Sequence, residues 1–94
     1  MQEILSPTLV EKEAIANFSF KNNVSFKQNP LLLKKLRDAT GLGNLSKVKF
    51  HIDFHSDSGP KSVQTTIWAT GNKFICLKGG LWIPIDKIID IRYI

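Results

Sequence analysis

The sequence predicts a small, mainly β domain of the α+β class, in which one helix precedes a strongly bent, five-stranded antiparallel sheet. Between residues 62 and 93, short apolar runs are separated by the pairs Gly71-Asn72 and Gly79-Gly80. Such pairs supply the positive φ that two-residue hairpin loops require. Ahead of these runs, a helical pattern begins at Asn29-Pro30 and is followed by an alternating strand pattern. A small β-barrel is the architecture that fits this order of elements.

Length and composition limit the chain to one domain with a modest core. It has 94 residues, one cysteine and a net charge of +5, and a chain of this size buries a single core. Residues 1–20 sum to −2 (one Lys, three Glu), residues 21–49 to +6 (seven Lys/Arg, one Asp) and residues 50–94 to +1 (five Lys/Arg, four Asp). A basic middle favours an anionic partner, although many small basic domains are simply soluble.

The sequence also carries expectations about compartment. No apolar run approaches the ~20 residues that span a bilayer, and the first residues lack the basic start and apolar stretch of a signal peptide. A single cysteine cannot form an internal disulfide and is compatible with a reducing compartment. We expect a cytoplasmic protein without a membrane partner, and composition indicates no cofactor and no small-molecule substrate.

Residues 1–28 are predicted to form an N-terminal arm, and residues 29–94 the small β-barrel domain. In the arm, Thr8 and Glu11 fit a capping box for a short helix over 9–16. Further along, four apolar residues fall on even positions and share one face of an extended chain, namely Phe18, Phe20, Val24 and Phe26. We expect the phenylalanines to cover an aromatic face of the barrel. The alternative is an arm exchanged with a second subunit.

The helix is predicted over residues 31–40, with Asn29 as N-cap, Pro30 at the first position and Gly41 at the end. Its apolar stripe consists of Leu32, Leu33, Leu36 and Ala39, and its basic residues Lys34, Lys35 and Arg37 face outward. Residues 47–55 then alternate as a strand. Val48, Phe50, Ile52 and Phe54 point inward, and Lys47, Lys49, His51, Asp53 and His55 point outward.

Two-residue loops at Gly71-Asn72 and Gly79-Gly80 fix the expected pairing of the later strands. Residues on alternate positions share a face. One face then holds Thr65, Ile67, Ala69, Phe74, Cys76, Ile83 and Ile85, and the other holds Gln64, Thr66, Trp68, Ile75, Leu77, Trp82 and Pro84. We expect the first face to be the inside. The second face is too apolar for water, so we expect the arm, a second copy or a ligand to cover it.

Catalytic and metal chemistry find little support in the sequence. His51, Asp53 and His55 share one side of a strand, but successive residues there lie roughly 6.6–6.8 Å apart along it, so the three converge poorly on one tetrahedral metal. They are weak metal candidates beside the simpler interpretation of a polar strand face. Cys76, expected on the inner face, behaves more simply as a small buried hydrophobe than as a nucleophile. We therefore expect a non-catalytic protein.

Trp68 and Trp82 form the most informative set of candidate residues, together with lysines. Aromatic side chains beside lysines on a small barrel can stack bases while the lysines contact phosphates. The basic candidates are Lys34, Lys35, Arg37, Lys47, Lys49 and Lys78. The alternative interpretation is that both tryptophans are packed under the arm, because apolar neighbours suit packing.

A family resemblance adds to this picture. The order of a helix, a bent strand array and a short turn before the last strand resembles the Sm-like small barrel, which is SH3-like in form. Leu77-Lys78-Gly79-Gly80-Leu81 is similar to the Arg-Gly element of the second Sm motif, whose residue pair contacts RNA in that family. Residues 83–88 resemble the Leu-x-Leu-Asp-Lys-Ile segment of Rof, the Sm-like Rho-binding antiterminator. The resemblance implies the barrel and, at Lys78 and Gly79, a contact with RNA.

The sequence therefore leads to two functional hypotheses. The first is a regulatory binding module that acts through protein contact or self-association, with the Trp68/Trp82 face or the strand edges as its interface. The second is an Sm-like protein that binds RNA or another single-stranded nucleic acid. Salt separates them, because phosphate contacts release counterions and weaken as salt rises, whereas an apolar interface responds little.

Overall fold

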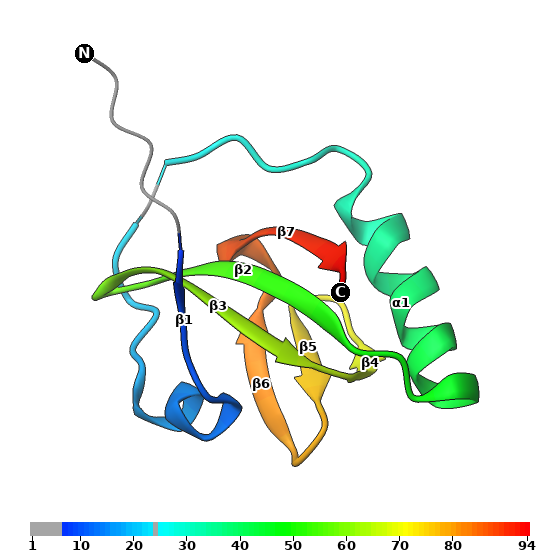
Figure 1. Cartoon of the computed structure of the whole chain (residues 1–94). Coiled ribbons are helices and arrows are strands. Elements are labelled where there is room, and N and C mark those ends of the chain that lie inside the picture. Colours follow the sequence, from blue (N-terminus) through cyan, green and yellow to red (C-terminus); the bar gives the residue numbers. More distant parts are fainter. Residues whose placement is uncertain (1–6, 24) are drawn as a thin grey trace.

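The computed structural model describes residues 7–23 and 25–94, which form one α-helix and two β-sheets (Figure 1). In chain order the elements are β1 (Thr8–Leu9), the 3₁₀ helix η1 (Lys12–Asn17), α1 (Leu32–Ser46), β2 (Phe50–Ser56), β3 (Gly59–Thr65), β4 (Ile67–Thr70), β5 (Phe74–Leu77), β6 (Leu81–Pro84), the 3₁₀ helix η2 (Ile85–Lys87) and β7 (Ile88–Tyr93). The α+β class is as predicted. The strands form a four-stranded sheet of order β1-β3-β2-β7 and a three-stranded sheet of order β4-β5-β6, not a single five-stranded sheet or a closed barrel.

The core lies between the two sheets and α1. In Figure 1, α1 flanks the sheets on one side, and β1 and η1 lie on the other side. Fully buried aliphatic residues come from both sheets, and their removal from water drives the packing. The largest side chains in the core are Phe50, Phe54, Leu36, Ile52, Ile67, Ile75, Leu77, Ile83 and Ile88.

The start of α1 lies one residue later than predicted, because the helix begins at Leu32 and its N-cap residue is Leu31, which has no side-chain cap. Asn29 is therefore not the N-cap. Its side-chain oxygen accepts a hydrogen bond from the Leu31 N–H at 2.9 Å, a turn of the Asx type just ahead of the helix. Leu32, Leu36 and Ala39 are buried as expected. Leu33, which the predicted apolar stripe includes, is 43% exposed, so this part of the prediction is wrong.

The end of α1 differs from the prediction. The helix continues past Gly41 to Ser46, and Lys47 ends it in the left-handed conformation, with φ 55° and its N–H bonded to the Gly43 carbonyl. A Cβ at Gly43 would lie 2.6 Å from the Ile67 carbonyl oxygen and 2.9 Å from the Thr66 methyl carbon. The missing side chain therefore lets α1 approach β4 closely, and this tertiary contact outweighs the weak helix propensity of glycine.

Strand β2 is the centre of the four-stranded sheet. It pairs antiparallel with β3 and with β7, so that Ile52 lies opposite both Val63 and Ile91. Phe50, Ile52 and Phe54 are buried, which confirms the predicted alternation. The strand begins at Phe50, three residues later than predicted, because Lys47 ends the helix and residues 48–49 connect the two elements.

The N-terminal arm takes a different course from the predicted one. Thr8 is not a helix cap but belongs to β1, which pairs in parallel with β3, and the helical turn that follows is the 3₁₀ helix η1. Phe18 and Phe20 pack against Phe54, at ring-centroid distances of 6.2 and 5.9 Å. Val24, which the predicted arm pattern includes, lies outside the described residues.

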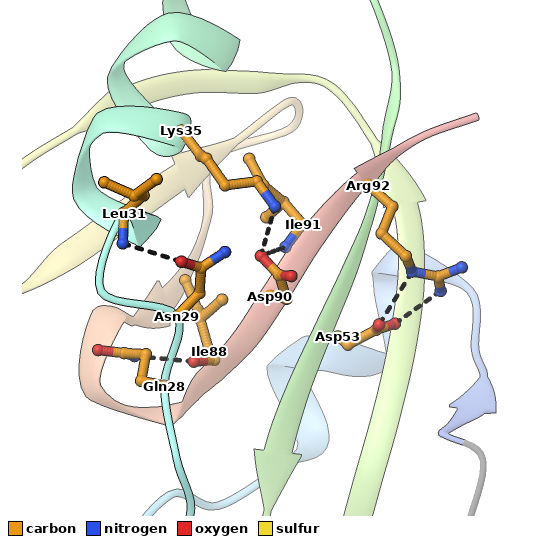
Figure 2. Close-up of polar contacts among 9 residues, drawn as sticks. All are labelled: Gln28, Asn29, Leu31, Lys35, Asp53, Ile88, Asp90, Ile91 and Arg92. Atoms are coloured by element: carbon orange, nitrogen blue, oxygen red, sulfur yellow. Dashed lines mark hydrogen bonds and ion pairs between the residues drawn. The ribbon is translucent and has the colours of Figure 1, made fainter.

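Polar contacts fasten the arm at both ends of its irregular stretch. The Asp57 carboxylate accepts hydrogen bonds from the backbone N–H groups of Lys21 and Asn22, at 3.2 and 2.8 Å. The Gln28 amide donates to the carbonyls of Ile85 and Ile88, each at 2.8 Å, and the second of these bonds is drawn in Figure 2. The arm therefore follows the four-stranded sheet and η2.

A membrane-spanning helix is not found among the residues that the structure describes, since none there is both long and apolar enough.

Candidate binding face

The register of β5 and β6 decides which side chains of the three-stranded sheet meet solvent. Leu77 pairs with Leu81, so the loop between them has three residues, and both Gly79 and Gly80 adopt positive φ (95° and 82°). The predicted two-residue loop is therefore wrong, because the loop is one residue longer. Cys76 lies opposite Trp82 and not opposite Ile83. Since a slip of one residue exchanges the faces of a strand, the predicted inner and outer sets are mixed.

The observed inner side of this sheet is formed by aliphatic residues, and its outer side carries aromatic ones. Ile75, Leu77 and Ile83 are fully buried, whereas Phe74 and Trp82 are exposed. Cys76 is half-buried on the outer side, so its predicted inward placement is wrong. The thiol lies beside Trp82 across the strand pair, and His51 and His55 belong to the other sheet.

A β-bulge in β4 adds a second tryptophan to the outer side. Ile67 pairs with Leu77 and Ala69 pairs with Cys76, so Trp68 is the extra residue between two successive pairs. A bulge breaks strict alternation, and Trp68 and Ala69 are both exposed while Ile67 is buried. At the far end, Thr70 pairs with Ile75 and not with Lys73, a shift of two residues that leaves the faces unchanged.

We call Trp68, Phe74 and Trp82 the aromatic face. Their side chains are 47%, 45% and 55% exposed. The Phe74 and Trp82 rings meet edge to face, with centroids 6.4 Å apart and an interplanar angle of 89°, which is a favourable geometry for aromatic pairs. The predicted cover by the arm is wrong, because Phe18 and Phe20 pack on Phe54 and Phe26 packs on His55.

Several of the predicted basic residues gather beside Trp68. Lys47 and Lys78 line a hollow of about 200 Å³ together with Trp68, Thr66 and the C-terminal turn of α1. Lys78 also lines a neighbouring groove of about 380 Å³, together with Lys49 and with Lys12 from η1. Lys12 Nζ lies 3.7 Å from the position that a Cβ would take at Gly79. The fold thus brings together Lys47, Lys49, Lys78 and Gly79 from the predicted set.

The basic residues of α1 do not join this cluster. The Lys34 ammonium pairs with the Asp38 carboxylate at 2.9 Å on the exposed helix surface, where Arg37 is also exposed. Lys35 pairs with Asp90 of β7 at 2.7 Å, as Figure 2 shows. Burial raises the pKa of the Asp90 carboxyl, but hydrogen bonds from Lys35 and from the Ile91 N–H outweigh burial, and the net pKa is lowered. Lys35 therefore tethers the helix to the four-stranded sheet.

The three weak metal candidates of β2 have other partners. The Arg92 guanidinium holds Asp53 with two hydrogen bonds of 3.1 Å, a bidentate arrangement visible in Figure 2. The His55 ring packs on Phe26 with centroids 4.7 Å apart. Its pKa is lowered by burial and by the charge of Lys87. Among the described residues, no group of three or more His, Cys, Asp or Glu side chains is arranged to hold a metal ion.

A second set of basic residues was not predicted from the sequence. Lys21, Lys73 and Lys87 line a groove of about 630 Å³ between the arm and the residues around β5, β6 and η2. Phe74 lines the same groove, so it adjoins the aromatic face. The pairing of Phe74 with Pro84 and the hydrogen bond from the Ile85 N–H to the Lys73 carbonyl place Lys73 near η2, and the path of the arm adds Lys21. Lys73 is the one member of this set whose position could be inferred from local sequence, because it lies in the hairpin loop next to Phe74.

Comparison with known proteins finds no matching family model, no matching curated protein and no matching solved structure. Function therefore has to be inferred from the residues of this chain.

Proposed function

We propose that this chain is a non-catalytic binding module whose aromatic face contacts a protein, either a regulatory partner or a second copy of the chain. The observation that carries this proposal is the half exposure of Trp68, Phe74 and Trp82 on one side of a three-stranded sheet. Large aromatic residues are enriched in the buried centres of protein interfaces. They are costly to leave in water, so an exposed cluster of this kind marks an interaction surface.

The surroundings of the aromatic face support a role in binding and not in catalysis. Cys76, the nucleophilic side chain on this face, has its thiol 3.7 Å from the neighbouring Leu77 carbonyl. A nucleophilic thiol needs a base or a positive environment that lowers its pKa. Both histidines of the chain are on β2, in the other sheet. We also propose that the strands follow an Sm-like or SH3-like order without closing into a barrel, which is supported by the 3₁₀ turn η2 just before β7.

Sedimentation equilibrium over a range of concentrations tests self-association. If a second copy covers the aromatic face, the mass rises with concentration and the indole emission shifts to the blue, and a Trp82→Ser variant stays monomeric. Leu45, an exposed residue of α1, provides the control, because a Leu45→Ser variant should associate like the wild type. A mass that is monomeric throughout excludes the second copy as partner.

Photo-crosslinking tests contact with another protein. A benzoylphenylalanine at the exposed Ala69 position should form adducts inside the cell, and the same residue at the exposed Gly41 position of α1 should not. Adducts at position 69 that disappear with Trp68→Ala and Trp82→Ala support the proposal. A monomeric mass together with equal labelling at both positions would contradict it.

A second candidate function, binding of single-stranded RNA, is supported by the hollow beside Trp68. The residues that line this hollow include two lysines and no carboxylate. An exposed indole can stack a base, and Lys47 and Lys78 are available to phosphates. The negative end of the α1 dipole faces the same region and opposes an anion, although Lys47 lies directly at that end.

Tryptophan fluorescence during titration with a short single-stranded RNA tests this candidate at low and at moderate salt. Quenching that weakens steeply with salt and is lost in Trp68→Leu would favour RNA. A Lys34→Gln variant is the control, since its ammonium lies on the far, solvated side of α1 with Asp38. Emission that stays constant throughout the titration would exclude stacking on either indole.

A further inference from the structure

The groove between the arm and the three-stranded sheet, hereafter the arm groove, is a hollow outside the aromatic face. It has a volume of about 630 Å³, which is within the range of sites that hold a ligand or a short peptide segment. Phe20 and Phe74 form part of its wall, with Pro84 and Ile85 from the end of β6 and the start of η2. Phe74 belongs both to this wall and to the aromatic face.

The charges of the arm groove are mainly positive. Lys21, Lys73 and Lys87 line it, against one carboxylate from Asp86. None of the three lysines forms an ion pair within the described residues, where the pairs are Lys34–Asp38, Lys35–Asp90 and Arg92–Asp53. The Lys87 ammonium instead donates to the Asn22 carbonyl at 2.6 Å. The groove is therefore lined by three cations and one carboxylate, and an acidic ligand complements this excess of positive charge.

The main chain of the arm adds a third element of recognition. Residues 25–28 have neither helix nor strand structure. Within the described part of the chain, their backbone N–H and C=O groups make no hydrogen bond to another element. An extended peptide can satisfy such groups along one edge while its alternate side chains enter pockets. Of these four residues Gln28 lines the groove, as does Asn23 earlier in the arm.

We propose that the arm groove binds an extended acidic peptide segment of a partner protein. Its carboxylates pair with Lys21, Lys73 and Lys87, and its apolar residues pack on Phe20 and Phe74. This inference rests on the proposed binding function and specifies the chemistry of the partner. A nucleic acid fits the groove less well, because a proline and an aliphatic side chain, Pro84 and Ile85, form part of its wall, whereas single strands bind by stacking successive bases on aromatic rings.

Fluorescence anisotropy of a labelled, end-capped peptide that alternates Glu with Leu and Phe tests the proposal with the full chain. We expect binding that a Lys21→Glu/Lys73→Glu variant weakens about tenfold or more, because both contacts become repulsive. A Lys34→Glu/Arg37→Glu variant changes the net charge equally on the exposed side of α1 and should bind like the wild type. All four positions are exposed, and a thermal melt checks folding.

Two further probes identify the source of any binding. The same peptide with Lys in place of Glu should not bind, and a single-stranded oligonucleotide should bind more weakly than the acidic peptide. Equal affinity for the acidic and basic peptides, equal weakening by both double variants, or preferential binding of the oligonucleotide would each overturn the proposal. Lys73→Gln alone, at an exposed loop residue, should still weaken binding if the double variant unfolds.

The outcome is separable from that of the proposed function. Trp68 does not line the arm groove, so Trp68→Ala probes the aromatic face and leaves the peptide site intact. No peptide binding, together with adducts at position 69, would overturn the acidic-peptide inference alone. Failure of both measurements would overturn the binding module as well.

Discussion

The four-stranded sheet turns polar side chains outward and nevertheless buries them, whereas the three-stranded sheet turns aromatic side chains outward and leaves them half exposed. On the first sheet, Asp53 is 9% exposed and Ser62 is 4% exposed. On the second sheet, Trp68 and Trp82 are about half exposed. Buried polar groups and exposed large apolar groups are the informative departures from the usual distribution, and here they occur on two neighbouring sheets of one small domain.

Different demands on the two surfaces account for this contrast. Asp53 is held by the Arg92 fork, and Phe26 covers His55, so the outer side of β2 serves the fold. Two polar atoms there, His51 Nδ1 and Ser62 Oγ, are buried without a hydrogen-bond partner in the described residues, and such atoms weaken stability. The aromatic face is about half exposed, which is expected if its role is to meet a partner.

The largest expected effect compares the same residue type on both sheets. Phe54→Ala removes a fully buried ring that supports Phe18 and Phe20, and should lower the free energy of unfolding by about 3–5 kcal/mol. Phe74→Ala removes a half-exposed ring, and should cost about 1 kcal/mol or less. Urea unfolding of both variants measures the difference. Equal losses would show that the aromatic face is part of the core.

The contact between α1 and the three-stranded sheet can be tested by two glycines of one helix. Gly43→Ala places a Cβ 2.6 Å from the Ile67 carbonyl oxygen, and should cost about 1–3 kcal/mol because the backbone has to move. Gly41→Ala faces open space and should stabilise the helix by up to about 1 kcal/mol. Opposite signs in thermal unfolding are expected, and two stabilising substitutions would contradict the close approach.

Substitutions on the polar outer side of β2 should lower the free energy of unfolding by a smaller amount. Asp53→Asn weakens both bonds to Arg92, whose side chain is itself half exposed, and should cost about 1–2 kcal/mol. Asp38→Asn on α1 breaks the solvated pair with Lys34 and should cost less than about 0.5 kcal/mol. Chemical denaturation at neutral pH compares the two. A result in the reverse order would remove the distinction between a structural and a solvated ion pair.

The smallest expected effect is the loss of stability that protonation of His55 causes at acidic pH. Burial, followed by the charge of Lys87, lowers the pKa of His55 below its ordinary value of 6.5, so the folded state favours the neutral ring. The associated stability is therefore complete above pH 6.5 and is lost as the pH falls through the lower folded value. Between neutral pH and pH 5, the denaturation midpoint should fall more in the wild type than in His55→Gln. Parallel pH profiles would contradict this assignment.

Local sequence signals were sufficient for the elements and insufficient for their partners. The Asn29-Pro30 pair predicted the start of α1 to within one residue, and the alternation of Phe50, Ile52 and Phe54 defines β2. The end of α1 was wrong because the packing of Gly43 on β4 is tertiary. The loop of β5 and β6 was wrong because two glycines with positive φ also fit a three-residue loop, and that single residue exchanges the faces of β6 relative to β5.

The candidate site was predicted only in part, because local sequence does not show which elements pack together. The importance of Trp68 and Trp82 was visible in the sequence, but their exposure depends on the bulge in β4 and on the course of the arm. Lys47, Lys49 and Lys78 line two neighbouring hollows, although Lys78 is far from the other two in the chain. Lys34 and Lys35 were separated from them by ion pairs with Asp38 and Asp90. Lys21, Lys73 and Lys87 share a groove, and of the three only Lys73 had a local signal, its position next to Phe74.

The pairing of β2 with β7 has a consequence for biosynthesis. Phe50 pairs with Tyr93, and their rings lie 5.0 Å apart, although more than forty residues separate them in the chain. During translation, β2 therefore emerges long before the strand that completes its second edge, and in the meantime it presents an unpaired apolar strand to other nascent chains. Pairing across so long a separation is slow. Until β7 has been synthesised, β2 can complete only the edge that pairs with β3.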